Sequence, residues 1–442
     1  MSLSRLSTLF GNTPLYIVGG AVRNMLLGVE PKDIDITAGM RAEDVIALLD
    51  GTEFSVVPSS LRMGTLIIKD GGDSYEYTCF RTDSYPAGSG VHTPVDVKFT
   101  DDIELDARRR DFTVNAIYYD IESGTYVDPL NGISDLRARV LRTTRTPREV
   151  FSEDGLRLMR LVRFSSELGF DIDEECYRVA CSLVHLLRDI SVERIEEELS
   201  KILLADVSGY GNTNGHYDGI NMLINIGAME YIMPELMRGA GVVQNRRYHS
   251  DDVLTHEVEA MRIADTDMRL VALLHDIGKP YELERTGNMH MHNVSGSRIV
   301  RDVLTRLRYP NKVIERASRL VYIHMFDIDN GAREDTIKRF ILDNVDYIHD
   351  FLRLRYADIM SSSKDLSSYD HIKAVYEDML RRGVPMRLRE LAISGDDLKA
   401  LGVRGKAIGE MLGVILRDVA LDRVANDRDA IVAHIRGGEW RL

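Results

Sequence analysis

A pair of carboxylates near the N-terminus has the type and spacing of a metal site. Residues 15–37 read LYIVGGAVRNMLLGVEPKDIDIT, and Asp33 and Asp35 stand one residue apart near the end of this stretch. Side chains alternate between the faces of a strand, so both carboxylates are expected on one face while the neighbouring isoleucines pack into the core. Two carboxylates side by side repel each other unless a cation lies between them, and oxygen ligands suit Mg²⁺. The stretch therefore predicts a magnesium site.

Gly19, Gly20 and Arg23 precede this carboxylate pair and add a phosphate-binding element. Glycines let backbone N–H groups approach a triphosphate closely, and an arginine neutralises phosphate charge. Metal, glycine turn and arginine together are what phosphoryl or nucleotidyl transfer requires. A lone DxD is more often a solvated strand end, but the preceding GGxxR makes the pattern much more specific. The dinucleotide fingerprint GxGxxG and the P-loop motif are absent, which disfavours their chemistries.

Further motifs follow in a fixed order. After GGAVRN…DIDIT come RRRDFTVNAIYYD, EDGLRLMRLVRF and, near the C-terminus, ISGDDLKALGVRGKAIGEMLGVIL. This series resembles the class II nucleotidyltransferase superfamily, which holds the tRNA nucleotidyltransferases (CCA-adding enzymes) and the bacterial poly(A) polymerases. The resemblance covers nearly the whole chain and implies that Asp33 and Asp35 hold the metal. One departure is Asn24, where the family usually has Asp after the arginine; it puts only the local support of Arg23 in question.

The segment EDGLRLMRLVRF predicts a mostly buried helix with a polar band along one side. Asp154 and Arg157 are expected to brace each other and to present a fixed acceptor beside a fixed donor. Cytosine and adenine match that arrangement, whereas guanine and uracil present the reverse and leave buried polar groups unpaired. The resemblance assigns base reading to this pair, phosphate contacts to Arg160 and Arg163, and a supporting place to Glu153. The alternative is a ladder of intrahelical salt bridges.

The segment RRRDFTVNA suggests contacts to the rest of a nucleotide. Arg110 can meet phosphate, and the resemblance implies that Asp111 accepts hydrogen bonds from ribose hydroxyls while Asn115 fixes the loop. The alternative is a basic turn before a strand. Glu76 is a candidate third carboxylate near the metal, but a solvated glutamate on an edge strand is the simpler interpretation.

A set of histidines and aspartates in the second half resembles the HD phosphohydrolase pattern, in which His, His-Asp and a distant Asp bind a divalent metal. Imidazole with carboxylate suits Mn²⁺, Fe, Ni²⁺ or Zn²⁺, and the two additional histidines fit a two-metal version. Any single histidine is more often a core or surface group, but the set favours a metal site. Hydrolysis is left open, because the YIHMFD segment lacks the plain HD ending; cyclic phosphate or 3′-phosphate ends of RNA would be the natural substrates. The set comprises His256, His275, Asp276, His292, His324 and Asp358.

The C-terminal LGVRGKAIG segment predicts a glycine-bounded turn between two helices. Backbone N–H groups at Gly402 and Gly405, with Lys406, are expected to hold an RNA backbone without reading sequence. The alternative is a simple glycine-capped helix junction.

Elements that position these residues follow from periodicity. Helices are expected at AEDVIALLD, from TPREV to SSEL and at SVERIEEELSKILLA, where Ser191 is a candidate N-cap. SYPAGSGVHTP and VSGYGNTNGHYDG are predicted loops because they are rich in glycine and polar residues. Five strands are expected, at 15–18, 33–37, 65–69, 74–80 and 114–120.

Length, net charge and cysteine content limit the class of protein and its cellular compartment. The chain has 442 residues and a net charge of −14, from 56 Lys and Arg against 70 Asp and Glu, so a general nucleic-acid coat is excluded, although clustered arginines can still bind RNA. Neither a signal peptide nor a membrane span is apparent. The cysteines Cys79, Cys176 and Cys181 show no CxxC pairing, which fits a reducing cytoplasm.

The predicted fold class is α+β, with a mixed-sheet head and an elongated all-α remainder. The expected domains are a nucleotidyltransferase head (1–140), a neck with the base-reading helix (141–206), a helical body with the HD site (207–385) and a tRNA-binding tail (386–442). The expected activity is Mg²⁺-dependent transfer of CMP and AMP from CTP and ATP to the tRNA 3′ end. The alternatives are a poly(A) polymerase, a partial CC- or A-adding enzyme, and an HD phosphohydrolase with a nucleotide- or RNA-binding head.

Overall fold

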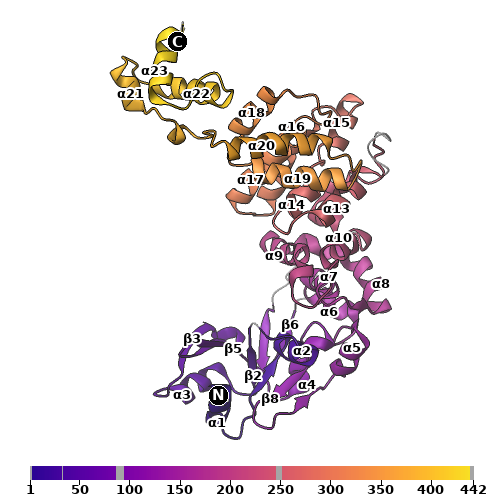
Figure 1. Cartoon of the computed structure of the whole chain (residues 1–442). Helices are drawn as coiled ribbons and strands as arrows, with labels where there is room; N and C mark the ends of the chain where they lie inside the picture. The colour runs from indigo at the N-terminus through magenta and orange to yellow at the C-terminus, as the bar shows by residue number, and fades with distance from the viewer. Residues whose placement is uncertain (1, 32, 86–93, 245–250, 439–442) are drawn as a thin grey trace. The chain divides into compact units, whose positions relative to one another are not determined.

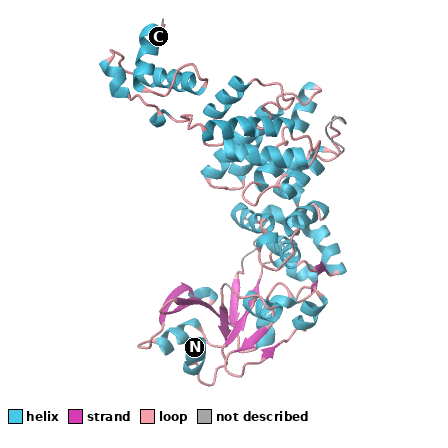
Figure 2. Ribbon diagram, viewed as in Figure 1, coloured by secondary structure: helices cyan, strands magenta, loops and turns pink. Residues whose placement is uncertain are grey.

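The computed structural model describes residues 2–31, 33–85, 94–244 and 251–438, and most of the predicted loop SYPAGSGVHTP lies outside these ranges. Strands concentrate in the N-terminal part and helices make up most of the remainder, so the predicted α+β class is confirmed (Figure 2). The chain divides into two compact units: Met1–Pro234 with Arg306–Arg308, and Glu235–Thr305 with Tyr309–Leu442. Among the described residues, none of the helices has the length and apolar character needed to cross a membrane.

The first unit is built on a mixed seven-stranded sheet with the order β3-β4-β5-β2-β1-β8-β9. Strands β2 and β5 are parallel, and the other neighbouring pairs are antiparallel. Two small two-stranded sheets, β6–β7 and β10–β11, complete the strands described. The bounds are β1 Tyr16–Val18, β2 Asp35–Ala38, β3 Ser55–Ser60, β4 Thr65–Asp70, β5 Asp73–Cys79, β6 Arg81–Ser84, β7 Asp96–Phe99, β8 Tyr118–Asp120, β9 Tyr126–Val127, β10 Val140–Leu141 and β11 Asp171–Ile172.

Alternation along the strands separates a packed face from a polar face. In β5, Tyr75, Tyr77 and Cys79 are buried, while Glu76 between them is exposed. The buried face joins a core with apolar residues of α1 (Ser2–Leu9), α2 (Gly20–Leu27) and α3 (Ala42–Leu49). The opposite face carries the carboxylates at the start of β2 and within β5.

The helical part of the first unit centres on α7, whose residues are almost all buried because α9 and α10 pack against it. The predicted helices at AEDVIALLD and SVERIEEELSKILLA are confirmed as α3 and α9, although the Ser191 side chain makes no capping hydrogen bond. The bounds are α4 Ile103–Arg108, α5 Gly132–Ala138, α6 Pro147–Glu153, α7 Leu156–Leu168, α8 Glu174–Leu183, α9 Val192–Leu203, α10 Gly215–Asn225 and α11 Met229–Ile232.

The second unit is helical throughout its described residues (Figure 1). A separate cluster of buried apolar residues, including Leu398, Met411 and Ile431, joins its last three helices. Helix α12 (Pro234–Met237) begins at the unit boundary. The remaining bounds are α13 Val253–Ile263, α14 Arg269–Leu274, α15 Lys279–Thr286, α16 His292–Arg306, α17 Asn311–Ile323, α18 Glu334–Asp343, α19 Ile348–Met360, α20 Ser367–Arg381, α21 Gly395–Ala400, α22 Ala407–Ala420 and α23 Arg428–Gly437.

Three local predictions need correction. The single helix expected from TPREV to SSEL is two helices, α6 and α7, because Asp154 adopts an extended conformation and Gly155 starts the second helix. The strand expected at 114–120 is shorter, since Thr113–Asn115 forms a 3-10 turn and only Tyr118–Asp120 pairs. Strand β3 and the short strands β6, β7, β9, β10 and β11 were not expected; the alternation in β3 is weak and it contains Pro58.

The compact units also differ in extent from the four predicted parts. Residues 207–234, which the prediction gave to the body, belong to the first unit, and α10 packs against α7 and α9 there. The four-part division itself stays a prediction.

Candidate active site

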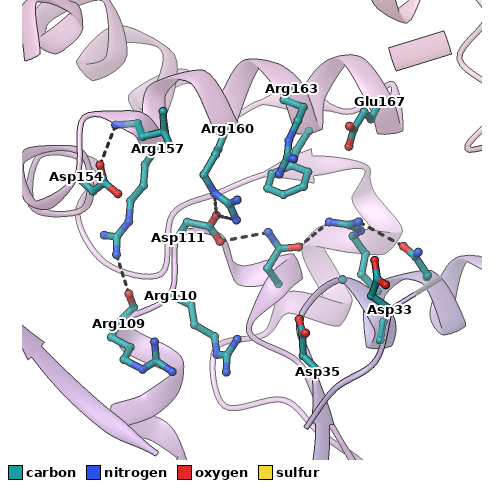
Figure 3. A pocket seen from close by; sticks show the side chains of 18 of the residues that line it. Asp33, Asp35, Arg109, Arg110, Asp111, Asp154, Arg157, Arg160, Arg163 and Glu167 are labelled. Carbon is teal, nitrogen blue, oxygen red and sulfur yellow. Dashed lines mark hydrogen bonds and ion pairs between the residues drawn. The ribbon is translucent and has the colours of Figure 1, made fainter. Parts of the chain in front are cut away.

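One cavity of about 850 Å³ in the first unit gathers the glycines, aspartates and arginines predicted for the head and the base-reading segment. It is lined from the β1–α2 turn, the start of β2, the segment after α4 and one side of α7 (Figure 3). The carboxylates Asp33 and Asp35 lie at one end and Asp154 at the other, with arginines between them. The sequence-predicted members are Gly19, Gly20, Arg23, Asp33, Asp35, Arg110, Asp111, Asp154, Arg157, Arg160 and Arg163.

Asp33 and Asp35 are both exposed to the cavity, but only Asp35 belongs to the strand, since Asp33 lies in the bend before β2. Partial burial, Glu76 and Asp33 raise the pKa of Asp35, and Arg110 only partly opposes them. Gly19 has a φ of +75°, and a Cβ there would lie 3.6 Å from Asp35 Oδ2. The backbone therefore passes close to a cluster of mutually repelling carboxylates, a donor set that fits a divalent cation.

Glu76 does not lie on an edge strand, so the simpler interpretation given above is wrong. Strand β5 lies inside the sheet, between β4 and β2, and Glu76 stands directly beside Asp35 in the parallel pair. Neighbours in register point to the same face, so Glu76 joins the carboxylate cluster. The signal was the strand period in SYEYTC, but the strand order that places β5 next to β2 cannot be read from that segment.

Arg109 and Arg110 are anchored by a fully buried carboxylate. Asp106 accepts from Arg109 Nε at 2.7 Å and from Arg110 Nη2 at 3.0 Å, and the Tyr118 hydroxyl donates to it at 2.7 Å. Burial alone would raise the pKa of Asp106, but the two arginines hold it at about 2. Sequence reasoning did not single out Asp106, although it is four residues before Arg110 on a helix.

Asp111 is buried and already paired. Its Oδ2 accepts from Arg160 Nε at 2.7 Å, and its Oδ1 accepts from Asn115 Nδ2 at 3.2 Å. Burial would raise the pKa of Asp111, but Arg160 and Arg157 outweigh it and hold the pKa at about 2. Asn115 thus fixes this loop as expected, and Arg160 is tied to Asp111 while its outer part remains in the cavity.

The expected brace between Asp154 and Arg157 is not the one observed. Asp154 Oδ2 pairs with Arg194 of α9 at 2.6 Å, and its Oδ1 accepts from the backbone N–H of Leu156 at 3.0 Å. Asp154 precedes α7, so helical spacing does not apply to it. Arg157 is held instead by Glu153, at 2.9 Å, and by backbone carbonyls, including that of Arg109. Acceptor and donor still line the same end of the cavity (Figure 3).

Phe164 organises three of the cavity arginines and was missed from the sequence. The guanidinium carbons of Arg23, Arg160 and Arg163 lie 5.0, 5.1 and 4.4 Å from its ring centre. Such contacts attract a cation without neutralising it. Arg163 is also paired with Glu198 at 3.1 Å, which leaves less of its charge for a phosphate. An apolar residue in a buried helix gives no sequence signal for this role.

The predicted histidine set comes together in the second unit. His256 on α13, His275 and Asp276 after α14, His292 on α16 and His324 after α17 are all buried, and Asp358 on α19 is nearly so. Asp276 Oδ2 faces His256 and His275 at 3.4 Å each, and Asp276 Oδ1 faces His292 at 3.1 Å and His324 at 3.5 Å. Two groups of converging ligand atoms therefore share Asp276.

The hydrogen bonds of the Nδ1 atoms explain why this set fits metal. His275, His292 and His324 place Nδ1 at 2.7, 2.8 and 2.6 Å from backbone carbonyl oxygens, which can only accept. Nδ1 therefore carries a proton, and Nε2 is the ring atom that faces inward and is available to a metal ion. Two Nε2 atoms lie 3.2 Å apart in His256–His275 and again in His292–His324. Two ring nitrogens at that distance need a proton or a metal ion between them.

Charges around the set support this interpretation. Burial would raise the pKa of Asp276, but Lys279 and His275 hold it well below its usual range, so the shared ligand is anionic. Burial lowers the pKa of His324 to about 4, which keeps its imidazole neutral. Burial would lower the pKa of His275, but Asp276 and Asp358 outweigh it and hold this pKa well above its usual range, so a metal ion would compete with a proton there. Imidazole with carboxylate suits Mn²⁺, Fe, Ni²⁺ or Zn²⁺.

The C-terminal turn has the predicted shape. Gly402 and Gly405 have φ of +94° and +63°, and Lys406 is exposed at the start of α22. The N–H of Gly402, however, donates to the carbonyl of Lys399 at 3.0 Å. Gly402 therefore serves as the cap of α21, and its N–H is not free for a phosphate.

Comparison with protein families gives three matches along the chain. The poly(A) polymerase head domain matches residues 15–142, the probable RNA- and SrmB-binding site of polymerase A matches 169–239, and the HD domain matches 247–350. These ranges contain, in order, the carboxylate cluster, most of the helices packed on α7, and much of the histidine set.

Similar proteins and structures extend the match. The CCA-adding enzyme of Lactobacillus helveticus is 40% identical over 187 residues, 42% of this chain and 45% of that enzyme. The alignment thus spans about half the length of that relative. The CCA-adding enzyme of Ligilactobacillus salivarius is 27% identical over 95% of this chain and 92% of its own length. The crystal structure of the Bacillus stearothermophilus CCA-adding enzyme in complex with CTP has a TM-score of 0.67 and 25% identity, covering 99% of this chain and 98% of that one.

The fold and the site define a nucleotidyltransferase head joined to a helical HD domain. The resemblance predicted from the sequence is confirmed: the chain is similar to the class II tRNA nucleotidyltransferases and poly(A) polymerases in its head domain, its RNA-binding segment and its HD domain.

The shared carboxylate predicts a metal stoichiometry. The second unit is expected to retain two divalent ions per chain, of which Asp276→Ala loses both and His292→Ala loses one, since only Asp276 belongs to both groups of ligands. Elemental analysis of the desalted protein measures this, with the exposed His349→Ala on α19 as the matched control. Equal retention by Asp276→Ala and the control would contradict the assignment.

Proposed function

We propose that this protein adds CMP and AMP from CTP and ATP to the 3′ end of tRNA, in CCA addition and repair. One observation carries the proposal: a single cavity holds the exposed carboxylate pair at one end and the Asp154 and Arg157 hydrogen-bonding groups at the other (Figure 3). A nucleotide lying between them would present its triphosphate to the carboxylate end and its base to the other end. The names of the similar enzymes support the same reaction.

Each residue has a defined task in this proposal. Asp33 and Asp35 would hold Mg²⁺, with Glu76 beside them, and the bound ion would neutralise charge on the α-phosphate and align the 3′-hydroxyl. The glycine turn brings backbone N–H groups to the triphosphate, and Arg23 and Arg110 meet its charge. Arg160 leaves its outer edge in the cavity for phosphate, whereas Arg163 is mainly committed to Glu198.

Base choice rests on Asp154 and Arg157, each fixed by a partner of its own. Because Arg194 and the Leu156 N–H hold Asp154, the acceptor has a set direction before the nucleotide arrives. A poly(A) polymerase or a CC- or A-adding enzyme would use the same cavity, so these remain the alternatives of the same class.

Partners and location complete the proposal. The tRNA 3′ end is the acceptor, and the exposed Lys406 and the turn around Gly405 in the tail are candidate contacts to its backbone. A cytoplasmic location is supported by the free thiols of Cys79, Cys176 and Cys181.

The second unit carries a second candidate function, an HD phosphohydrolase. Converging Nε2 atoms around an anionic Asp276 favour it, because metals held there would polarise a phosphate ester and lower the pKa of a bound water. Cyclic phosphate or 3′-phosphate ends of RNA are the proposed substrates.

The metal-site assignment in the head is tested by removing its ligands. Asp33→Ala and Asp35→Ala are expected to reduce CTP and ATP incorporation into tRNA lacking its 3′ end by about a hundredfold or more, because a lost metal ligand removes several kcal/mol of transition-state stabilisation. Asp50→Ala, an exposed aspartate after α3, is the control. Near wild-type incorporation by either variant would contradict the assignment.

Base choice is tested with single-nucleotide addition from each of the four triphosphates. The wild type is expected to prefer CTP and ATP over GTP and UTP by roughly 10⁴ or more. Asp154→Ala removes the acceptor and is expected to relax this preference, with a smaller loss of rate than Asp33→Ala. Arg194→Ala keeps the acceptor but frees it, so an intermediate relaxation is expected. An unchanged four-way preference in Asp154→Ala would place base reading elsewhere.

The hydrolase is tested on RNA oligonucleotides ending in 2′,3′-cyclic phosphate or 3′-phosphate. His275→Ala is expected to abolish phosphate release while CTP incorporation continues, and Asp35→Ala is expected to do the reverse, because the two sites belong to different units. Phosphate release that survives in His275→Ala would show that the HD site is not its source.

A further inference from the structure

The loop SGYGNTN, residues 208–214, brings Tyr210 into the nucleotide cavity. It follows the 3-10 turn Ala205–Val207 and precedes α10, and Gly209 and Gly211 on either side of the tyrosine have φ of +100° and +84°. The Asn212 side chain ties the loop to α7 by donating to the carbonyl of Ser166 at 2.7 Å. Tyr210 lines the cavity although it lies 187 residues from Arg23 in the chain.

The Tyr210 hydroxyl joins α2 to this loop through two hydrogen bonds. It donates to Asn24 Oδ1 at 2.7 Å and accepts from Arg23 Nη2 at 2.9 Å. The Tyr210 ring centre also lies 5.5 Å from the guanidinium carbon of Arg23. One side chain therefore fixes both the position and the orientation of this guanidinium.

The partners of Arg23 do not neutralise it. Arg23 is 4% exposed, and its Nη atoms donate to Asn115 Oδ1 at 2.7 Å, to Asn24 Oδ1 at 3.3 Å and to Tyr210, all uncharged acceptors. Within the part of the chain that the structure describes, no carboxylate forms an ion pair with it, and its Nε has no hydrogen-bond partner. Glu167 in the same cavity interacts with Arg23 electrostatically but forms no ion pair with it. A buried cation without a paired counterion is costly, so this arrangement is suited to an anion that arrives from outside.

Asn24 takes part in the same arrangement. An aspartate, which the resembled family usually has at this position, would add a negative charge beside the Arg23 guanidinium and reduce the positive charge that this chain offers to an anionic ligand. With asparagine, Tyr210 and Asn24 supply hydrogen-bond geometry while the positive charge remains available.

We propose that Tyr210 is a positioning residue that holds Arg23 on the triphosphate of the incoming nucleotide, and that the loop from Ser208 to Asn214 is part of the nucleotide site. The identity of the anion rests on the proposed function. Tyr210 acts on the phosphates through Arg23 and takes no part in reading the base.

Equilibrium binding of CTP and CMP to the full chain with Mg²⁺, in the absence of tRNA, tests this. Tyr210→Phe removes the hydroxyl and keeps the ring, and is expected to weaken CTP binding about tenfold while CMP binding changes little. In addition assays, the KM for CTP should rise more than kcat falls. Tyr177→Phe on α8, a partly exposed tyrosine outside the cavity lining, is the matched control.

Asn24→Asp provides an independent second variant. It is expected to weaken CTP binding more than CMP binding, because the new carboxylate takes up the charge of Arg23. Equal weakening of CTP and CMP by Tyr210→Phe, or wild-type CTP affinity in both variants, would overturn the inference. Wild-type protein that binds CTP but adds nothing to tRNA would contradict the proposed function and leave this binding test valid.

Discussion

Pairing between arginines and carboxylates decides where the side chains of the cavity point. Asp106 sets Arg109 and Arg110, Asp111 sets Arg160, and Arg194 sets Asp154. These pairs connect α7 and α9 to neighbouring segments and α4 to the residues that follow it. The same contacts therefore shape the cavity wall and stabilise the fold of the first unit. Removing one partner of such a pair leaves an uncompensated charge, which costs far more than the pair contributes.

The same pairing would be harmful if it were complete, because a cavity for phosphates must keep net positive charge. Aromatic rings resolve this conflict. Phe164 lies close to the guanidinium carbons of Arg23, Arg160 and Arg163, and Tyr210 adds a second ring beside Arg23. A ring face favours a cation by its quadrupole and leaves its charge in place. The acidic chain as a whole can thus contain a locally cationic cavity, since it is the local field that acts on a phosphate.

The sequence predicted what depends on local spacing and missed what depends on contacts between distant segments. The amphipathic α9 follows from the period of 3.6 residues and was found where expected. The DxD pair reaches the cavity, but only Asp35 lies in the strand that the period of two predicted for both aspartates. Asp154 was placed on a helix because the segment is helical on both sides, but the extended Asp154 and the Gly155 start break it. Tyr210 reaches the cavity only through the packing of its loop, and Glu76 lies beside Asp35 only through the order of the strands, which the local sequence does not give.

The first unit buries a cation and the second unit buries an anion, and in both a ligand of opposite charge would complete the interactions. In the first unit, Arg23 is buried with uncharged hydrogen-bond partners, which leaves its charge available to an anionic ligand. In the second unit, carbonyl oxygens accept from Nδ1 of His275, His292 and His324, so that the Nε2 atoms of these rings surround the anionic Asp276, where a metal ion or a proton can bind. In each case the protein satisfies the outer edge of the side chain and leaves the inner edge unsatisfied. A buried polar group without a partner is destabilising by itself, so such a consistent pattern across several residues is best explained by a bound ligand that supplies the missing interaction.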